Sequence, residues 1–449
     1  MPSIVMLIIE LFMLSIVKSI GIVNIDNILA SILIILFTIS FLISIQNNMI
    51  LEKYGKQLFV GYMFRVFLLY FDLFGKRIRA LPQSGGDTES FYWNAANAVL
   101  YGKPNRSNQF IVLITKLFSV IGINRLYGQF LLMLFSIGTI IIFVYIIESL
   151  KLDSVIKENI TWIICLLPNF ALLSSVFLRE SIITMLITAS LYVMIKWVRN
   201  GSSIYFITAI AISTVACLYH SGCIGIIIGC IICLMLYNPY SGKTQTTISG
   251  IILAIVFAIV VSFVFLQYSD DLMMKFSKVG SIEDVANVNR MGGSTYAQYV
   301  GDSSNPFNMI VYTLPRIFYF LFSPFPWQWR GIADIIAFFF SGLFYFVTIV
   351  KVIVYLKNKE SLNRGIIICL LIIAFFCTFI FAWGVSNTGT ASRHRDKMVC
   401  LYGIINALTT NVSKQRQEEK YSKLKSQDVV AEQSSYLATK EYRYENQTL

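Results

Sequence analysis

Long apolar runs alternate with short polar segments along most of the chain. A bilayer core requires about 20 apolar residues for each crossing helix, and runs of this kind predict twelve membrane-spanning helices. They cover residues 4–23, 28–45, 58–74, 127–148, 160–178, 182–198, 204–219, 223–236, 248–266, 332–354, 366–384 and 398–410. The pattern therefore predicts an all-α polytopic membrane protein, with a membrane domain at residues 1–410 and a polar tail at residues 411–449.

Two further apolar runs are too short or too interrupted to be counted as spans. The run at residues 110–123 contains Lys116, and the run at residues 307–322 is broken by Pro315 and Arg316. Such segments are typical of interfacial or re-entrant helices. Leaving them out gives an even number of crossings, which puts both termini on the same side of the membrane.

The basic residues indicate which side this is, because short cytoplasmic loops are enriched in Lys and Arg. If the N-terminus is cytoplasmic, every short inner loop is basic. The residues concerned are Lys53, Lys56, Lys151, Lys157, Lys196, Arg199, Lys243, Lys351, Lys357, Lys359 and Arg364. Both termini are therefore expected in the cytoplasm, with outer loops at residues 75–108, 267–306 and 385–397. The first apolar run lacks a basic start and a cleavage site, so we expect it to be retained as a span.

Composition supports the membrane class and raises one question. The chain is 56% hydrophobic and only 13% charged, about half the charge of a soluble protein, which excludes a water-soluble enzyme. It nevertheless has a net charge of +12, and many basic residues fall on the predicted outer side. Either the chain has fourteen spans, which would reassign the later loops, or the outer face binds an anionic ligand; we adopt the second interpretation.

Motifs for cofactors are absent from the sequence. Nucleotide-binding, calcium-binding and zinc-protease patterns do not occur. Cys230 and Cys233 have metal-ligand spacing, but they lie in the middle of an apolar run without a polar neighbour, so packing explains them better. No cofactor or resident metal is therefore predicted.

The first outer loop contains a carboxylate at the start of a predicted helix. Asp87 follows two glycines and precedes Phe91, Tyr92, Ala95 and Val99, which recur at helical spacing. One interpretation makes Asp87 an N-cap that complements the helix dipole, together with the following Glu89. The other makes Asp87 a general base at the membrane surface.

A second charged pair, Arg179 and Glu180, lies at the predicted outer end of a span. An ion pair that closes a tight helical hairpin would explain the two residues structurally. Alternatively, Arg179 offers a planar fork for a phosphate, and Glu180 orients it or binds a sugar hydroxyl. Charges near the bilayer are costly, which favours the functional interpretation.

The two histidines of the chain, His220 and His394, both fall at outer ends of predicted spans. His394 lies between Arg393 and Arg395, two cations that should lower its pKa and keep the ring neutral. A neutral imidazole beside guanidinium groups that bind phosphate could exchange a proton with a reacting oxygen. Snorkelling of these side chains to the membrane surface is the structural alternative.

The order of these features resembles the GT-C class of membrane glycosyltransferases. Asp87 before an aromatic helix is followed by a short run ending at residues 118–123, then Arg125, Leu167-Pro168 and Arg179-Glu180. Two further stretches, Ser323-Pro-Phe-Pro-Trp-Gln-Trp-Arg330 and Asn387-Thr-Gly-Thr-Ala-Ser-Arg-His-Arg395, resemble bacterial repeat-unit polymerases for surface polysaccharides. Asp87 and Glu89 replace the adjacent acidic pair of many class members, so the resemblance leaves a divalent metal undecided.

The resemblance implies an enzyme of the bacterial cytoplasmic membrane that joins undecaprenyl-pyrophosphate-linked repeat units of capsule or O-antigen at the outer face. Its implied catalytic residues are Asp87, His394 and Glu180. Its implied substrate-binding residues are Arg179, Arg393, Arg395, Glu89, Arg330 and His220. Implied partners are the lipid-linked glycan, the bilayer, a flippase and a chain-length regulator, with no nucleic acid.

Two other functions remain open. One is a flippase or transporter of the same lipid-linked glycan, which would also use outer arginines but favours internal repeats. The other is an outer-face acyl- or phosphoethanolamine-type transferase, which would depend on His or a metal cluster.

Overall fold

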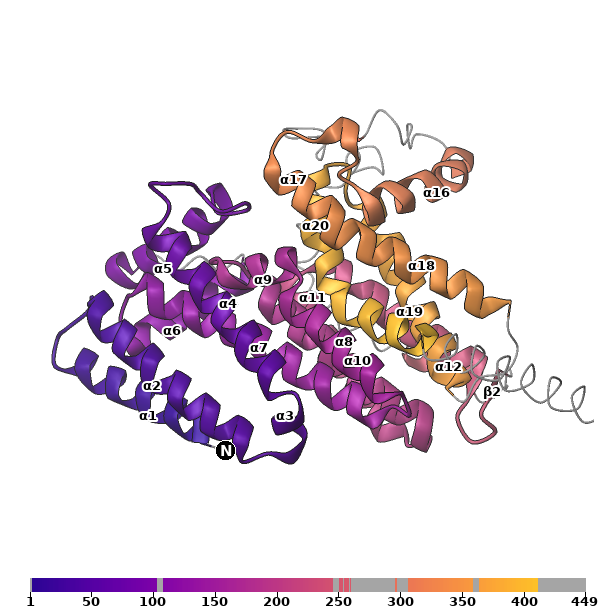
Figure 1. The fold of residues 1–449 in the computed structure, drawn as a ribbon, viewed down its shortest axis with the longest axis horizontal. Helices are drawn as coiled ribbons and strands as arrows, with labels where there is room; N and C mark the ends of the chain where they lie inside the picture. Colours follow the sequence, from indigo (N-terminus) through magenta and orange to yellow (C-terminus); the bar gives the residue numbers. More distant parts are fainter. Residues whose placement is uncertain are drawn as a thin grey trace, which may run out of the picture.

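The computed structural model describes residues 2–102, 108–244, 306–357 and 363–410, together with 250–252, 254–257, 259, 295 and 296. This part of the chain is almost entirely helical, with one short two-stranded ribbon (Figure 1). The first half consists of α1 (Pro2–Ser19), α2 (Asn27–Gln46), α3 (Met49–Lys53), α4 (Gly55–Phe74), α5 (Gly86–Tyr101), α6 (Gln109–Ile121), α7 (Arg125–Ser149), α8 (Ser154–Leu166), α9 (Pro168–Ser175) and α10 (Glu180–Asn200). The second half consists of α11 (Ser203–Tyr219), η1 (Ser221–Cys223), α12 (Ile224–Leu236), β1 (Tyr237–Asn238), β2 (Lys243–Thr244), α16 (Pro306–Phe322), η3 (Pro326–Gln328), α17 (Ile332–Ile336), η4 (Ala337–Gly342), α18 (Leu343–Leu356), α19 (Arg364–Trp383), α20 (Thr388–Arg395) and η5 (Asp396–Met398), after which residues 399–410 are again helical.

Helices of membrane-spanning length confirm the general class of protein. Within the described residues, seven helical stretches are long and apolar enough to cross a bilayer, and α8 with α9 makes an eighth if this bent pair is one span. The seven are α1, α2, α4, α7, α10, the continuous stretch Ile332–Leu356 and α19. The described part of the chain is therefore almost entirely helical and of the multi-pass membrane type, but the twelve predicted spans are not confirmed.

Some of the predicted spans form bent or shorter helices for identifiable reasons. The predicted span at residues 160–178 bends by 47° between α8 and α9, where Pro168 lacks the amide proton that a continuous helix needs. The helix α11 has 17 residues, about 26 Å, somewhat less than the roughly 30 Å of a hydrocarbon core. The predicted span at residues 248–266 is only partly described, and the tail at residues 411–449 lies outside the described residues, as does almost all of the loop at residues 267–306.

The two doubtful apolar runs form shorter helices. The helix α6 has 13 residues and buries one face, including Phe110, Ile114 and Phe118, against α5, α1 and the start of α7. The helix α16 has 17 residues with Pro315 inside it. Both are shorter than the helices that pass as spans, and α5 and α6 form one hairpin above the ends of α1 and α2 (Figure 1).

A buried arginine fixes the segment that leads into α10. Arg65 of α4 is fully buried and donates hydrogen bonds to Ser136 Oγ of α7 at 3.0 Å, Ser174 Oγ of α9 at 3.1 Å and the Cys165 carbonyl of α8 at 2.6 Å. An unpaired cation would be costly in this apolar interior, so these acceptors are held in place. The arginine therefore ties α9, and with it the turn before α10, to the centre of the bundle.

Candidate functional site

Segments from three distant parts of the sequence meet in one charged cluster. They are the start of α5, the start of α10, and α20 with the adjoining η5. Arg393 of α20 donates from Nε to Glu180 Oε1 at 2.7 Å and from Nη1 to Asp87 Oδ2 at 2.6 Å. The Glu180 side chain is only 4% exposed, whereas that of Asp87 is 62% exposed. Arg393 thus connects one buried carboxylate with one that faces the surface.

The local sequence at the start of α5 leaves Asp87 available for this contact. The Gly85 amide donates to Thr88 Oγ1 at 3.1 Å, and the Thr88 hydroxyl donates back to the Gly85 carbonyl at 2.9 Å. Thr88, the third residue of the helix, therefore satisfies the backbone amide and carbonyl of the N-cap residue Gly85. The prediction of Asp87 as the N-cap is wrong, because Gly85 occupies that position and Asp87 lies in the first turn.

Arg179 is the residue immediately before α10, at its N-cap position. It is partly buried, its guanidinium lies 5.9 Å from the centre of the Phe91 ring, and its Nε has no hydrogen-bond partner among the described residues. Burial is the main cause that lowers its pKa, with Glu180 opposing this effect. The sequence also allowed a simple ion pair between Arg179 and Glu180. In the structure, Glu180 instead accepts a hydrogen bond from Arg393.

The cations and carboxylates of the cluster shift each other's ionisation. Burial lowers the pKa of Arg393, but Glu180 and Asp87 outweigh this effect and the net pKa is raised. Arg393 is therefore firmly positive. The pKa of His394 is lowered well below its usual range, as expected from the sequence. Burial is the largest cause, followed by Lys397, Arg393 and Arg179, so that of the two flanking arginines only Arg393 is among the main causes.

The two histidines contact each other. The rings of His220 and His394 are nearly perpendicular, with centroids 4.6 Å apart, and the Phe381 ring lies 5.5 Å from both. His220 Nδ1 accepts a hydrogen bond from the Gly222 amide at 3.1 Å. His394 Nδ1 is buried without a hydrogen-bond partner among the described residues.

Arg395 lies next to the cluster in sequence but is used differently. Its side chain is fully buried and donates to the carbonyls of Leu321 at 3.0 Å and Ser323, and to Ser341 Oγ at 3.2 Å. Its own carbonyl accepts from the Tyr345 hydroxyl at 2.7 Å. These contacts join α20 to the end of α16 and to η4, so Arg395 has a structural role here and is not carried forward as a ligand-binding residue.

The remaining sequence candidates lie outside the Arg393 contacts. Glu89 accepts from Lys76 and from Arg125, each at 2.8 Å, and so joins α5 to the start of α7. Arg330 is exposed in the loop before α17, and its amide donates to Asp334 Oδ2 at 2.9 Å. Of the nine sequence candidates, the structure therefore brings together Asp87, Arg179, Glu180, His220, Arg393 and His394.

Three residues of the cluster, Lys397, Asn169 and Asp396, were not selected as candidates from the sequence. Lys397 follows Arg393 by four positions, which places both on one helical face, and this spacing could have identified it. Asn169 Nδ2 donates to Ser392 Oγ at 2.7 Å and to Asp396, connecting α9 with the α20–η5 turn. No sequence pattern singles out Asn169, because its partners are more than 220 residues away.

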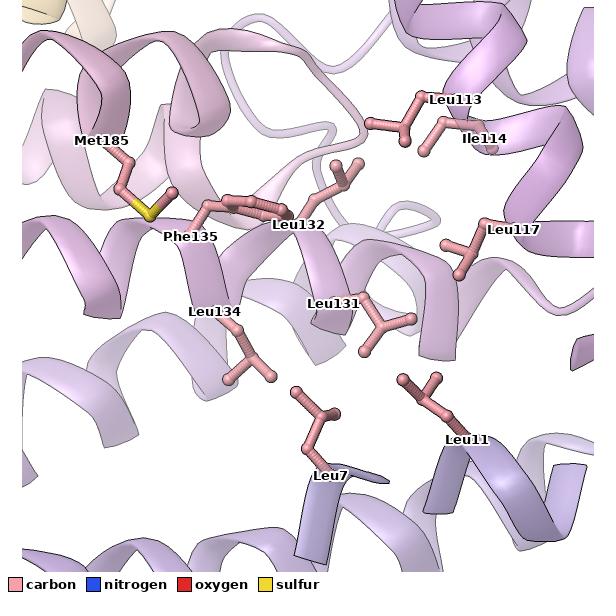
Figure 2. Close-up of a pocket in the computed structure, with 10 residues that line it drawn as sticks. All are labelled: Leu7, Leu11, Leu113, Ile114, Leu117, Leu131, Leu132, Leu134, Phe135 and Met185. Atoms are coloured by element: carbon pink, nitrogen blue, oxygen red, sulfur yellow. The ribbon is translucent and has the colours of Figure 1, made fainter. Parts of the chain in front are cut away.

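An apolar pocket lies between α1, α6, α7 and α10 (Figure 2). It has a volume of about 370 Å³ and is lined by side chains of α1, α6, α7 and α10 that point toward one another, namely Leu7, Leu11, Leu113, Ile114, Leu117, Leu131, Leu132, Leu134, Phe135 and Met185. Met185 follows Glu180 by five residues on α10, about 7.5 Å along the helix axis. An apolar compartment thus begins about one and a half helical turns from the charged cluster.

Among the described residues, no group of three or more His, Cys, Asp or Glu side chains is placed to hold a metal ion. What the cluster offers to a ligand is therefore a set of cations with one exposed carboxylate. This combination can bind an anion and accept a proton beside it. No protein-family model matches the chain, and no curated protein or solved structure does either.

Proposed function

We propose that the chain is a membrane glycosyltransferase that joins polyprenyl-diphosphate-linked oligosaccharide repeat units at the outer face of the bacterial cytoplasmic membrane. The observation that carries this proposal is the convergence of Arg393, Arg179 and the exposed Asp87 at the predicted outer ends of the helices. A diphosphate leaving group needs fixed positive charge, and the attacking hydroxyl needs a proton acceptor. This convergence supplies both kinds of group within one cluster.

The chemistry assigns a task to each residue. Arg393 and Arg179 bind the diphosphate of the donor, and the acceptor-sugar hydroxyl attacks the anomeric carbon. The new carbon–oxygen bond forms as the bond to the diphosphate oxygen breaks, and the electron pair leaves with the polyprenyl diphosphate. Asp87 takes the hydroxyl proton, while His394, which is less exposed, is the second candidate for this step. Glu180 holds the guanidinium of Arg393 in orientation.

The apolar pocket in Figure 2 supports a lipid-linked substrate. Its lining is wholly hydrocarbon and sulfur, and it lies next to helices of membrane-spanning length. An isoprenoid chain could occupy this pocket, which includes Met185, a residue about 7.5 Å along the α10 axis from Glu180. Leu131→Trp and Met185→Trp would fill the pocket, and we expect both to raise the KM for lipid-linked donor.

Deletion of the gene tests the proposed function. In the deletion strain we expect single exported repeat units and no long glycan ladder on a gel. The wild-type gene should restore the ladder, and the Arg393→Met gene should not. Lipid-linked repeat units that accumulate on the cytoplasmic side would contradict a polymerase and would instead support a flippase.

A flippase of the same glycan is the second candidate, and one observation favours it. Glu10, Arg65 and Asp72 are buried within the first three membrane-spanning helices, and ionisable residues inside membrane helices often mark transport paths. In this structure, however, Arg65 donates to several fixed acceptors, Asp72 accepts from Gln129 and Glu10 accepts from Tyr127. These contacts favour packing over transport.

A further inference from the structure

Lys397 is the one cation of the cluster with no access to the surface. It lies on η5 behind Glu180, and its side chain is 0% exposed. The distance from Lys397 Nζ to Glu180 Oε1 is 3.9 Å, which is too long for a hydrogen bond. Among the described residues, Nζ has no hydrogen-bond partner.

Other unpaired polar atoms surround the same space. Glu180 Oε2 and Ser181 Oγ are also buried without partners among the described residues. They line, together with Lys397, Arg393 and Asp396, a cavity of about 10 Å³, which is roughly the room that one water needs. The amine therefore faces a carboxylate across a space that accommodates a single water, rather than a larger ligand.

The surroundings do not favour a permanent charge on this amine. The carboxylate of Glu180 faces the amine from α10. Arg179 of the same turn and Arg393 of α20 are positively charged and oppose a further charge. The other titratable groups nearby are His394 of α20, Cys223 of η1 and Asp396. Burial is the largest influence and lowers the pKa of Lys397 to about 7, against the opposing effect of Glu180. At neutral pH, both the amine and the ammonium are therefore populated.

A diphosphate would change this balance. Arg393 uses Nε for Glu180 and Nη1 for Asp87, and a guanidinium has five N–H donors in all, so a diphosphate can bind the remaining N–H groups. The positive charge of Arg393 is then shared between Glu180 and the ligand, and the ligand adds negative charge of its own. Both changes favour the protonated form of a lysine nearby.

We propose that Lys397 is a positioning residue that takes up a proton from solvent when a diphosphate binds Arg393, and thereby holds Glu180 in place. The inference rests on the proposed function, because it requires a diphosphate site at Arg393. No covalent bond changes in this step, since a solvent proton adds to Nζ and converts the amine into an ammonium. The Lys397 side chain is too deeply buried to touch the substrate itself.

Calorimetry of inorganic pyrophosphate binding to the purified full chain in detergent tests this inference. Titrations at pH 8 in two buffers with different ionisation enthalpies give the number of protons taken up for each ligand bound. We expect the wild type to take up about 0.5–1 more proton than Lys397→Met, whose side chain cannot titrate. The proton uptake of pyrophosphate itself is common to both proteins and cancels in the difference.

One control variant and one stability measurement make each outcome informative. Lys196→Met removes a lysine roughly 24 Å from Glu180 along the same helix and should behave as wild type. Lys397→Met replaces a buried amine by an apolar side chain of similar length, so we expect it to fold at least as well as wild type. Thermal unfolding in detergent verifies this.

Failure of the inference differs from failure of the proposed function. Arg393-dependent binding with equal proton uptake in wild type and Lys397→Met would overturn the role of Lys397 alone. Binding no stronger in wild type than in Arg393→Met would overturn both the diphosphate site and the inference that rests on it.

Discussion

Asp87 and Arg393 form a 2.6 Å ion pair although 306 positions separate them in the chain. The contact joins the start of α5 to α20 and lies at the exposed edge of the charged cluster. Arg393 also holds the buried Glu180, so one of its two carboxylate partners is fixed and the other is open to exchange. A diphosphate approaching from solvent would therefore meet Asp87 first, and Asp87 would be released beside the reacting hydroxyl.

Asp87→Asn should separate chemistry from folding. The carboxylate is largely exposed, so its loss should cost no more than about 1 kcal/mol of stability. If Asp87 is the general base, the transfer rate should fall about 10²–10⁴-fold, measured with lipid-linked repeat units as the substrate. Ser90→Ala, at an exposed neighbour on α5, is the control. A normal glycan ladder in cells that express Asp87→Asn would remove Asp87 from the mechanism.

The Glu180–Arg393 pair should show strong energetic coupling. Arg393→Met leaves a buried carboxylate without its closest partner, which should destabilise the protein by about 3–5 kcal/mol. Adding Glu180→Gln removes that charge, so the double variant should unfold at a higher temperature than Arg393→Met alone. Thermal unfolding in detergent measures all four members of the cycle. Strictly additive effects would show that the two side chains do not interact in solution.

Arg395→Lys should impair folding rather than substrate binding. A lysine keeps the charge but lacks the fork that serves the Leu321 and Ser323 carbonyls and Ser341 at once. We expect a lower yield of monodisperse protein and a lower unfolding temperature. The KM of the protein that does fold should stay near the wild-type value, and a selective rise in KM would show that Arg395 binds substrate after all.

Acid should weaken the anchoring of α5 in a predictable pH range. The pKa of Glu89 is lowered to about 2 from its ordinary 4.5. The hydrogen bond from Arg125 is the largest cause, Lys76 lowers the pKa further, and burial acts in the opposite direction. Because the folded-state pKa is depressed, this contribution to stability is present above pH 4.5 and is lost as the pH falls toward 2. The unfolding temperature of Glu89→Gln should therefore depend less on pH in this range than that of wild type. Parallel curves for the two proteins would contradict the assignment.

Cysteine labelling tests the predicted orientation in the membrane. All eight native cysteines are buried, so background labelling should be low. Ser90→Cys on exposed α5 should react with a membrane-impermeant maleimide added to intact cells. Met49→Cys, at a position 89% exposed near the opposite helix ends, should react only after permeabilisation. The reverse pattern would invert the topology and place the charged cluster in the cytoplasm.

Sequence patterns predicted the class of fold and most of the cluster, because both depend on local features. Apolar runs identify membrane helices, and the stretch at residues 332–354 agrees closely with the continuous helical segment Ile332–Leu356. Asp87, Glu180 and Arg393, which fall on the predicted outer side, stood out because apolar surroundings make charge expensive. In the structure, Arg393 pairs with both carboxylates.

The contact partners of the charged side chains and the exact lengths of the helices could not be predicted in the same way. Hydropathy does not register the break at Pro168, so α8 and α9 were expected as a single unbroken span. Arg393 and Arg395 look equivalent in sequence, two residues apart, but they project from different sides of α20 and meet carboxylates in one case and backbone carbonyls in the other. Only tertiary contacts distinguish them.

The long separation between Glu180 and its partners has a consequence for biosynthesis. Arg393 follows Glu180 by 213 residues, so in a chain that is still being synthesised α10 exists long before Arg393 and Lys397. Until α20 arrives, Glu180 lacks the cation to which it is hydrogen-bonded in the folded protein. Packing of α10 around Glu180 is therefore complete only when the last described helices have been made. A chain truncated before residue 393 would leave the Glu180 carboxylate without this partner.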